Sequence, residues 1–321
     1  MAKSKPQTSG TGKYEELLAA CSKFPPVATA VAHPCEDAAL AATIEAAEAG
    51  LIRPILVAPV ATLKALARRL KIDLKPYELV DVPHSHAAAD KAVELVRSGQ
   101  ADMLMKGSLH SDEFLGAIVA RETGLRTGRR LSHVFVMDVP TYHKVFIITD
   151  AAINITPDLE AKADIVQNAI DLARVLGVKQ PKVGILSAVE TVTSKIPSTL
   201  DAAALCKMAD RGQIKGGLLD GPLAFDNAIS KQAAKTKGIV SAVAGDIDIL
   251  LAPDMEAGNM LAKQLSFLAN ADSAGLVLGA RVPVVLTSRA DSVRARLASV
   301  AVAVRMVAAH RMQVAKCAKK T

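Results

Sequence analysis

Short apolar segments alternate with longer, Ala-rich segments along most of this chain. The apolar segments are rich in β-branched and aliphatic residues and cover residues 27–32, 54–58, 79–82, 103–105, 134–137 and 145–149. The segments between them carry charged residues at helical spacing. Because buried strands are short and apolar whereas surface helices keep a polar face, this alternation predicts a series of βα units.

Glycines mark the ends of three of the predicted helices. The helices predicted over residues 36–49, 86–98 and 111–123 run into Gly50, Gly99 and Gly124. A residue that follows a helix often takes the left-handed conformation, which glycine adopts without steric cost. We therefore expect all three glycines to be left-handed.

A second series of the same kind follows. It has predicted strands at 183–186, 217–219, 249–252 and 274–278, with helices near 158–176, 198–211, 228–236 and 257–269. A last strand, 284–287, leads into a long helix near 293–315. The strands are almost wholly apolar, as in parallel sheets covered by helices on both faces. Two α/β lobes are predicted, with ligands bound outside the carboxyl ends of the strands.

Length and composition agree with this reading. A chain of 321 residues corresponds to about two domains. With 50% hydrophobic and 22% charged residues the chain is typical of globular proteins. Residues 1–13 are polar and aperiodic, which predicts a flexible tail. No apolar run is long enough for a membrane span or a signal peptide, so we expect a cytoplasmic protein that does not bind membranes.

The chain is basic, with a formal charge of +7 and a pI of about 9.2. A basic surface attracts anions of any kind. Aromatic residues are only 3% with no Trp, and no helix-turn-helix or zinc-finger spacing occurs, which argues against nucleic acid. A small phosphorylated substrate fits better, and a non-catalytic acyl-phosphate or nucleic-acid binder is the alternative.

The segment PVVLTSRADS, residues 283–292, has the most chemistry. Thr287, Ser288, Arg289 and Asp291 follow a buried strand and precede a helix. A guanidinium fork, a hydroxyl and the N–H groups of a helix start all suit a phosphate. The alternative is an ordinary helix start, capped by Ser292 or Asp291, with Arg289 in solvent.

Three further segments are weak when taken singly. They are DMLMKGS (102–108), KGGLLDGPLAFDN (215–227) and PDMEAGN (253–259). Lys106 and Gly107 close a strand and could present an ammonium and an N–H group to an anion. The Asp, Gly, Pro and Asn residues of the other two are also ordinary in turns and helix caps.

Several common sites are absent from the sequence. Cys21, Cys35, Cys206 and Cys317 form no CxxC pair, which predicts reduced thiols. Neither GxxxxGK[ST], nor GxGxxG after a strand, nor GxSxG occurs. The sequence therefore predicts no metal site, no P-loop, no dinucleotide fingerprint and no serine hydrolase.

Taken in order, seven segments resemble the phosphate acetyl/butyryltransferase family, especially its butyryltransferase-like branch. They are ADMLMKGSLHSDEFL (101–115), GLRTGRRLSHVFVM (124–137), TDAAINITPDLE (149–160), KVGILSAVETVTSKIPST (182–199), DRGQIKGGLLDGPLAFDNAIS (210–230), GDIDILLAPDMEAGNML (245–261) and PVVLTSRADS. The resemblance covers about residues 90–315.

The resemblance implies a two-lobed α/β fold of mostly parallel sheets flanked by helices, like isocitrate and isopropylmalate dehydrogenases. Residues 14–150 plus 282–321 would form the first lobe and 151–281 the second. The implied enzyme is a homodimer that exchanges acyl-CoA plus phosphate with acyl phosphate plus CoA in a ternary complex. Coenzyme A would be a substrate, with no bound cofactor.

The family also implies roles for particular residues. Arg289 would clamp the phosphate, Ser288 would donate a hydrogen bond to the carbonyl or bridging oxygen, and Asp291 would accept the thiol proton. The implied substrate-binding residues are Lys106, Gly107, Ser132, His133, Asn154, Glu190, Asp220, Asn227, Gly258 and Asn259.

This chain departs from the acetyl-specific branch at three positions. Gly116 and Gln264 stand where that branch has arginines, so Arg126, Arg129 or Lys263 would replace them. Ala295, seven residues after Ser288, stands where that branch has its catalytic Asp, which leaves Asp291 as the nearest carboxylate. The choice between acetyl and butyryl groups stays open.

A dehydrogenase of the same fold is the rival prediction. Such an enzyme would depend on a metal and NAD(P), with Asp220, Asp226 and Asp246 as ligands. No feature of the sequence indicates hydride transfer.

Overall fold

The computed structural model describes residues 12–288 and 291–318. Arg289 therefore lies outside the described residues, as does most of the predicted tail. The first helix begins at Lys13, the last residue of that predicted tail.

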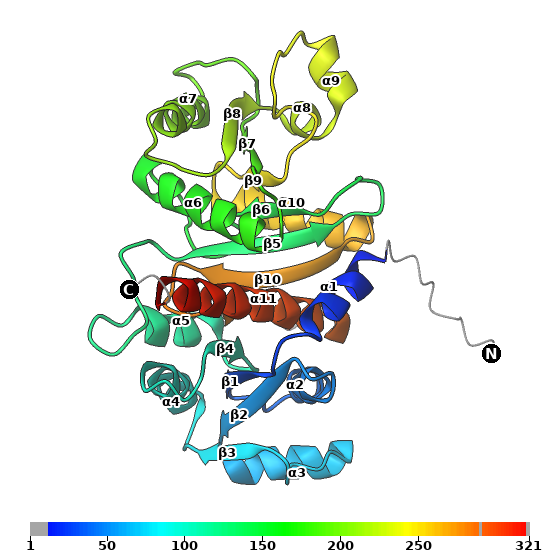
Figure 1. Cartoon of the computed structure of the whole chain (residues 1–321), viewed down its shortest axis with the longest axis vertical. Coiled ribbons are helices and arrows are strands. Elements are labelled where there is room, and N and C mark those ends of the chain that lie inside the picture. Colours follow the sequence, from blue (N-terminus) through cyan, green and yellow to red (C-terminus); the bar gives the residue numbers. More distant parts are fainter. Residues whose placement is uncertain (1–11, 289–290, 319–321) are drawn as a thin grey trace, which may run out of the picture.

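One eleven-stranded sheet runs through the molecule (Figure 1). Its strand order is β3-β2-β1-β4-β11-β10-β5-β6-β9-β7-β8. In chain order the strands are β1 (Val27–Ala32), β2 (Ile52–Ala58), β3 (Glu78–Asp81), β4 (Met103–Lys106), β5 (Ser132–Asp138), β6 (Phe146–Thr149), β7 (Lys182–Leu186), β8 (Leu218–Leu223), β9 (Ile249–Leu251), β10 (Asp272–Leu278) and β11 (Val284–Val285).

Strand direction divides this sheet. The strands from β3 to β11 are parallel to one another, and so are those from β6 to β8. Three antiparallel pairings, β11 with β10, β10 with β5 and β5 with β6, separate the two sets. The two sets consequently run in opposite directions, and their carboxyl ends lie at opposite edges of the sheet.

Helices cover both faces of the sheet. One face carries α1 (Lys13–Cys21), α2 (Asp37–Glu48), α3 (Val60–Leu70), α6 (Leu159–Val175), α7 (Pro197–Asp210) and α11 (Val293–Ala318). The other carries α4 (Ser85–Arg97), α5 (Ser111–Val119), α8 (Phe225–Ile229), α9 (Lys231–Thr236) and α10 (Met255–Leu268). Figure 1 shows α11 crossing in front of β10, with α1 beside it.

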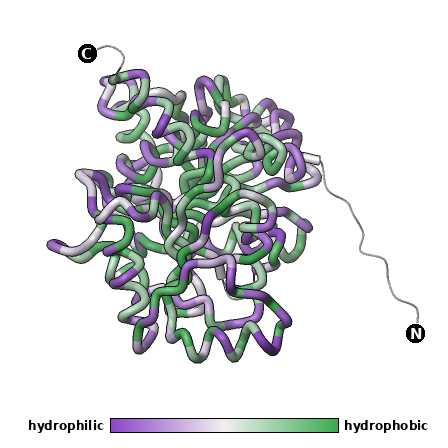
Figure 2. The backbone as a smooth tube through the Cα atoms, turned by 60° about the horizontal axis from the view of Figure 1, so that its bottom comes forward, coloured by the Kyte–Doolittle hydropathy of each residue, from purple (hydrophilic) through white to green (hydrophobic). Residues whose placement is uncertain are grey.

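Apolar side chains between the sheet and these helices form the core. In Figure 2 the hydrophobic positions are concentrated in the interior of the molecule, whereas hydrophilic positions are frequent at its periphery. Within the part of the chain that the structure describes, no helix is long and apolar enough to cross a membrane. The predicted class, a mostly parallel α/β sheet flanked by helices, is confirmed.

Several local predictions were wrong. The predicted helix near 228–236 is two helices, α8 and α9, because the Ser230 side chain caps α9 by accepting the Ala233 N–H. Strand β8 continues to Leu223, so Asp220 lies within a strand and not after one. Gly50 and Gly99 are left-handed as predicted, but Gly124 is not. It is instead a close-approach position, where a Cβ would come 2.4 Å from backbone oxygens.

Candidate active site

Ser288, after β11, and Asp291, just before α11, are hydrogen-bonded to each other. The Asp291 carboxylate accepts the Ser288 N–H at 2.7 Å, and the Asp291 N–H donates to the Ser288 carbonyl at 3.2 Å. The Ser292 hydroxyl accepts the Ala295 N–H at 3.1 Å and so caps the helix. Ser292 therefore caps the helix, as one of the two predicted alternatives proposed. Asp291 does not cap it through these contacts and instead fixes the backbone of Ser288.

A buried arginine that the sequence reasoning missed supports the loop of Ser288 and Asp291 from α11. Arg296 is 3% exposed. Its guanidinium donates to the Thr287 hydroxyl at 3.0 Å and to the Ser288 carbonyl at 2.8 Å, and its Nε donates to the Asp291 carbonyl at 3.4 Å. Both ends of the loop are thereby tied to one side chain.

Lys106 and Gly107 lie at the same edge of the sheet as Ser288. Strands β4 and β11 are parallel neighbours, so their carboxyl ends emerge together. Lys106 is 3% exposed. A Cβ on Gly107 would come 2.4 Å from the backbone oxygens of Ala32 and His33, so only glycine lets the chain pass so close to the end of β1.

A second group of the predicted residues surrounds Asp150, which the sequence reasoning also missed. Asp150 is 2% exposed and follows β6. Its Oδ1 accepts the N–H groups of Ala152 and Ile153 at 2.9 and 3.0 Å. Its Oδ2 accepts the His133 N–H at 3.1 Å and the Asn154 amide at 2.6 Å.

The start of α10 packs against the same loop. A Cβ on Gly258 would lie 2.3 Å from the Asp150 carbonyl oxygen, and the Asn259 amide donates to the Ala151 carbonyl at 2.9 Å. The Ser132 hydroxyl accepts from the Asn168 amide at 3.0 Å. The structure thus brings His133, Asn154, Gly258 and Asn259 together around residues 150 and 151, whereas the Ser132 hydroxyl contacts Asn168.

His133 connects this group with the Ser288 loop. Its side chain is buried, and this burial lowers the pKa of His133. The charge of Asp150, a hydrogen bond with the backbone of Leu286 and the charge of Asp291 act in the opposite direction but do not outweigh the burial. Nδ1 is buried without a partner among the described atoms, which leaves Nε2 for Leu286. The imidazole is therefore neutral, with its tautomer set by a carbonyl at the start of the loop.

The remaining predicted residues lie in the outer part of the sheet. The buried Asn227 amide donates to Glu190 at 3.3 Å, and Lys237 bridges Glu190 and Asp226 at 3.3 and 3.4 Å. Asp220 accepts the N–H of the residue that follows it. The described contacts do not join these residues to the Ser288 loop or to Asp150.

The predicted site residues do not share one edge of the sheet. Ser288 and Lys106 lie at the carboxyl ends of the first strand set, whereas Asn154, Glu190, Asn227 and Gly258 follow strands of the opposite set. The reason is the three antiparallel pairings in the middle of the sheet. Among the described residues, His133 on β5 interacts with both groups, because its N–H donates to Asp150 and its side chain is hydrogen-bonded to the backbone of Leu286.

Of the basic residues proposed as replacements, Arg129 has a clear partner. It forms an ion pair with Asp171 at 2.5 Å and contacts Asn168 at 3.4 Å. It thus lies near Ser132, the partner of Asn168, and not at the Ser288 loop.

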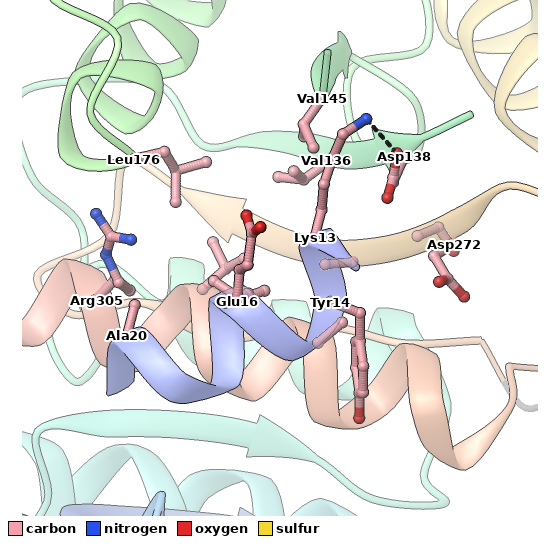
Figure 3. A pocket seen from close by; sticks show the side chains of 15 residues that line it. Lys13, Tyr14, Glu16, Ala20, Val136, Asp138, Val145, Leu176, Asp272 and Arg305 are labelled. Carbon is pink, nitrogen blue, oxygen red and sulfur yellow. Dashed lines mark hydrogen bonds and ion pairs between the residues drawn. The ribbon is translucent and has the colours of Figure 1, made fainter. Parts of the chain in front are cut away.

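A cavity of about 430 Å³ lies on the α11 face of β5 and β10 (Figure 3). Lys13, Asp138, Asp272 and Arg305 lie at its charged rim, and Val136, Leu176 and other apolar side chains form its wall. None of the predicted site residues lines it.

No group of three or more potential metal-ligating His, Cys, Asp or Glu residues occurs within residues 12–288 and 291–318. Asp246, named in the dehydrogenase alternative, is paired with Lys182 at 2.6 Å and with Lys144 at 3.0 Å. Burial acts to raise the pKa of Asp246, but hydrogen bonds from these lysines and His143 hold it well below the usual range.

Solved structures with the same fold include a branched-chain phosphotransacylase from Enterococcus faecalis, 31% identical, with a TM-score of 0.78 over 88% of this chain and 99% of that one. A 4-hydroxythreonine-4-phosphate dehydrogenase from Klebsiella pneumoniae has a TM-score of 0.55 at 12% identity, over 88% of this chain and all of that one. At that identity only the fold is shared. The fold is that of the phosphotransacylases, which it matches more closely than this dehydrogenase.

Sequence comparisons identify the family. A phosphate acetyltransferase from Rhizobium meliloti is 66% identical over 91% of this chain and 92% of its own length. A phosphate butyryltransferase from Clostridium beijerinckii is 42% identical over 90% and 96%. The family model described as "Phosphate acetyl/butaryl transferase" matches residues 85–304. The chain belongs to the phosphate acetyl/butyryltransferase family, as the resemblance indicated.

Proposed function

We propose that this protein is a phosphate acyltransferase, which interconverts acyl-CoA plus phosphate and acyl phosphate plus CoA. Family membership over residues 85–304 is the observation that carries this proposal. The local geometry supports it, because Ser288 and Lys106 emerge at one sheet edge beside a helix start, where anions bind well. The dehydrogenase alternative has support from the fold alone.

In the proposed mechanism the thiol of CoA attacks the carbonyl carbon of an acyl phosphate, and phosphate leaves with the bond electrons. Arg289 binds the phosphate and stabilises the charge that develops on it. The Ser288 hydroxyl donates a hydrogen bond to the carbonyl or bridging oxygen. The role of Arg289 rests on the resemblance of the segment PVVLTSRADS to the family and on the fit of a guanidinium to phosphate oxygens.

Asp291 is proposed to accept the thiol proton. One of its oxygens already accepts the Ser288 N–H, so the other would face the substrate. A thiol and an aspartate differ by about 4.6 pKa units, or about 6 kcal/mol for complete transfer. We therefore propose that the proton moves as the sulfur–carbon bond forms, and not beforehand.

The acyl group is proposed to be acetyl, with butyryl as the second choice. The Rhizobium meliloti relative, named as an acetyltransferase, is 66% identical, whereas the Clostridium beijerinckii butyryltransferase is 42% identical. Rates with acetyl-CoA, propionyl-CoA and butyryl-CoA plus phosphate decide this. A pocket that discriminates between acyl groups by size changes the activation free energy by about 1–3 kcal/mol for each methylene.

The test of the residue roles compares Ser288→Ala and Arg289→Ala with wild type, following release of free thiol from acetyl-CoA and phosphate. We expect no turnover with Arg289→Ala and a smaller loss with Ser288→Ala. Ser292→Ala is the matched control, since it removes a hydroxyl that caps α11 and has no proposed chemical role. Wild-type rates with Arg289→Ala contradict the assignment.

We also propose that the protein is a homodimer. Helix α10 leaves Met260, Phe267 and Leu268 exposed by 59%, 71% and 81%, all on one face. A second copy of the chain would cover this apolar surface. Sedimentation of wild type and Phe267→Glu tests this, and an unchanged dimer in the variant contradicts α10 as the interface.

The predicted lobes, 14–150 plus 282–321 and 151–281, stay part of this proposal. The antiparallel strands β10, β5 and β6 lie where these lobes would meet. Substrates would then bind between the Ser288 loop and the Asp150 group.

A further inference from the structure

Arg296 is unusual among the arginines of α11 because it is buried. Its side chain contacts the segment 287–291 through three donors, and all three acceptors are neutral oxygens. By contrast Arg294, two positions earlier, is partly exposed and paired with Asp272 at 2.9 Å and Glu15 at 3.1 Å. Arg305 donates to the backbone carbonyl of Val175 at 3.0 Å.

The guanidinium of Arg296 has no ion-pair partner among the carboxylates of the described residues. The charges of Asp291 and Glu36 influence its pKa, which burial lowers, but neither carboxylate is hydrogen-bonded to it. Guanidinium stays protonated at any pH that the protein tolerates. A desolvated cation without a paired anion is costly, so its retention calls for an explanation beyond a helix start.

The position of this charge suggests the explanation. Arg296 donates to the carbonyl of Ser288, the residue just before Arg289, and to the hydroxyl of Thr287, at the edge where Lys106 also emerges. In a poorly hydrated environment a positive charge stabilises an anion over several ångströms much more than in water. An anion bound at the Ser288 loop would therefore be the counterion that Arg296 lacks.

We propose that Arg296 is a positioning residue of the acyl-transfer site, which holds Thr287, Ser288 and Asp291 in place and stabilises phosphate beside Ser288 through its unpaired positive charge. This inference rests on the proposed function, because it needs an inorganic anion at the Ser288 loop. It assigns no contact between Arg296 and substrate, since Nε and both terminal nitrogens of the guanidinium already donate to the loop.

A purely structural role would give a different pattern. If Arg296 only fixed the backbone around Ser288, every substitution would lower kcat to the extent that it disorders this backbone. Lysine would then be no better at this position than an uncharged side chain. If its charge matters as well, lysine keeps the phosphate affinity better than methionine, although both lose the planar set of donors.

The experiment compares Arg296→Met and Arg296→Lys with wild type and with Arg305→Met, which removes another guanidinium from the same helix. Steady-state kinetics with acetyl-CoA give kcat and the KM for phosphate, and melting temperatures show that each variant is folded. We expect Arg296→Met to raise the KM for phosphate about tenfold or more. Arg296→Lys should fall between Arg296→Met and wild type, and Arg305→Met should match wild type.

Two further measurements separate the outcomes. Added guanidinium chloride, below concentrations that lower the melting temperature, should restore part of the activity of Arg296→Met and of no other variant. Calorimetric titration with inorganic phosphate tests the charge without turnover, so the inference remains testable if the wild type transfers no acyl group and the proposed function fails.

A folded Arg296→Lys with the same kcat loss and the same phosphate affinity as Arg296→Met overturns the proposal. So does an unchanged phosphate KM in both variants. If Arg296→Met does not fold, Arg296→Lys is compared with wild type alone. A phosphate affinity of Arg296→Lys that falls by the same factor as its kcat then overturns the proposal.

Discussion

Replacing Asp150 with asparagine should be among the most damaging conservative substitutions in the protein. The carboxylate accepts four hydrogen bonds, two on each oxygen. An amide offers one oxygen, and its NH2 group would face two donors. Hydrogen bonds to a charged group contribute about 1.5–3 kcal/mol each, so the loss of two costs about 3–6 kcal/mol. That is a large part of the about 5–15 kcal/mol by which domains are stable.

Urea unfolding followed by circular dichroism measures this loss, since the chain has no Trp for fluorescence. The matched control is Asp164→Asn, because Asp164 is only partly buried and accepts a single N–H, that of Arg130, in a solvent-exposed hydrogen bond of 2.9 Å. We expect the control to lose about 1 kcal/mol at most. A free energy of unfolding for Asp150→Asn within about 1 kcal/mol of wild type would refute the reasoning. Activity should also fall, because Asp150 anchors the backbone of His133.

Three other outcomes are expected. Gly107→Ala should destabilise the fold by about 1–3 kcal/mol in urea unfolding, because the new methyl would meet the last carbonyl of β1 at 2.4 Å, and Gly116→Ala, with open space, should not. Burial lowers the pKa of His133, so the unfolded chain binds this proton first and stability declines as pH falls below about 6.5. His133→Gln should flatten that decline, and an unchanged pH profile argues against a neutral buried imidazole. Burial raises the pKa of Cys35 to about 11 and that of Cys206 to about 12, so neither thiol is ionised at neutral pH. Labelled phosphate should then not exchange into acetyl phosphate unless CoA is present, and exchange without CoA would indicate a covalent acyl-enzyme.

The alternation of apolar and charged segments predicted most of the strands and helices, because each has a strong local pattern. Strand direction has no such pattern, since an apolar strand looks the same in a parallel and an antiparallel pairing. The pairings of β10 with β11 and β5 therefore could not be predicted, and neither could the separation of Lys106 from Asn154 across the sheet.

Arg296 could have been found from the sequence. Helical spacing places it on the same side of α11 as Ser299, Val300 and Ala303, which are all buried. A charged residue on the apolar face of a helix indicates a buried partner or a function. The segment PVVLTSRADS, which carries the recognisable chemistry, ends four residues before Arg296 and so does not include it.

Asp150 was overlooked for a different reason. It follows the apolar strand 145–149 and lies in the family segment TDAAINITPDLE, but Thr149 and the alanines beside it give the carboxylate no chemical partner that is visible in the sequence. Its four donors come from residues 133 and 152–154 and depend on the pairing of β5 with β6. Their convergence is a property of the tertiary fold and not of local spacing.

The position of β11 has a consequence for biosynthesis. This strand lies between β4 and β10, yet it comes after every other strand in the order of translation. Until it emerges from the ribosome, one side of β4 has no neighbouring strand, although all four residues of β4 are buried in the finished fold. The apolar positions that α11 covers also face water during this time. A nascent chain in that state presents a surface on which other strands can add. Slow elongation over the last forty or so codons should therefore favour aggregation or chaperone binding, even though β11 covers this side of β4 in the finished molecule.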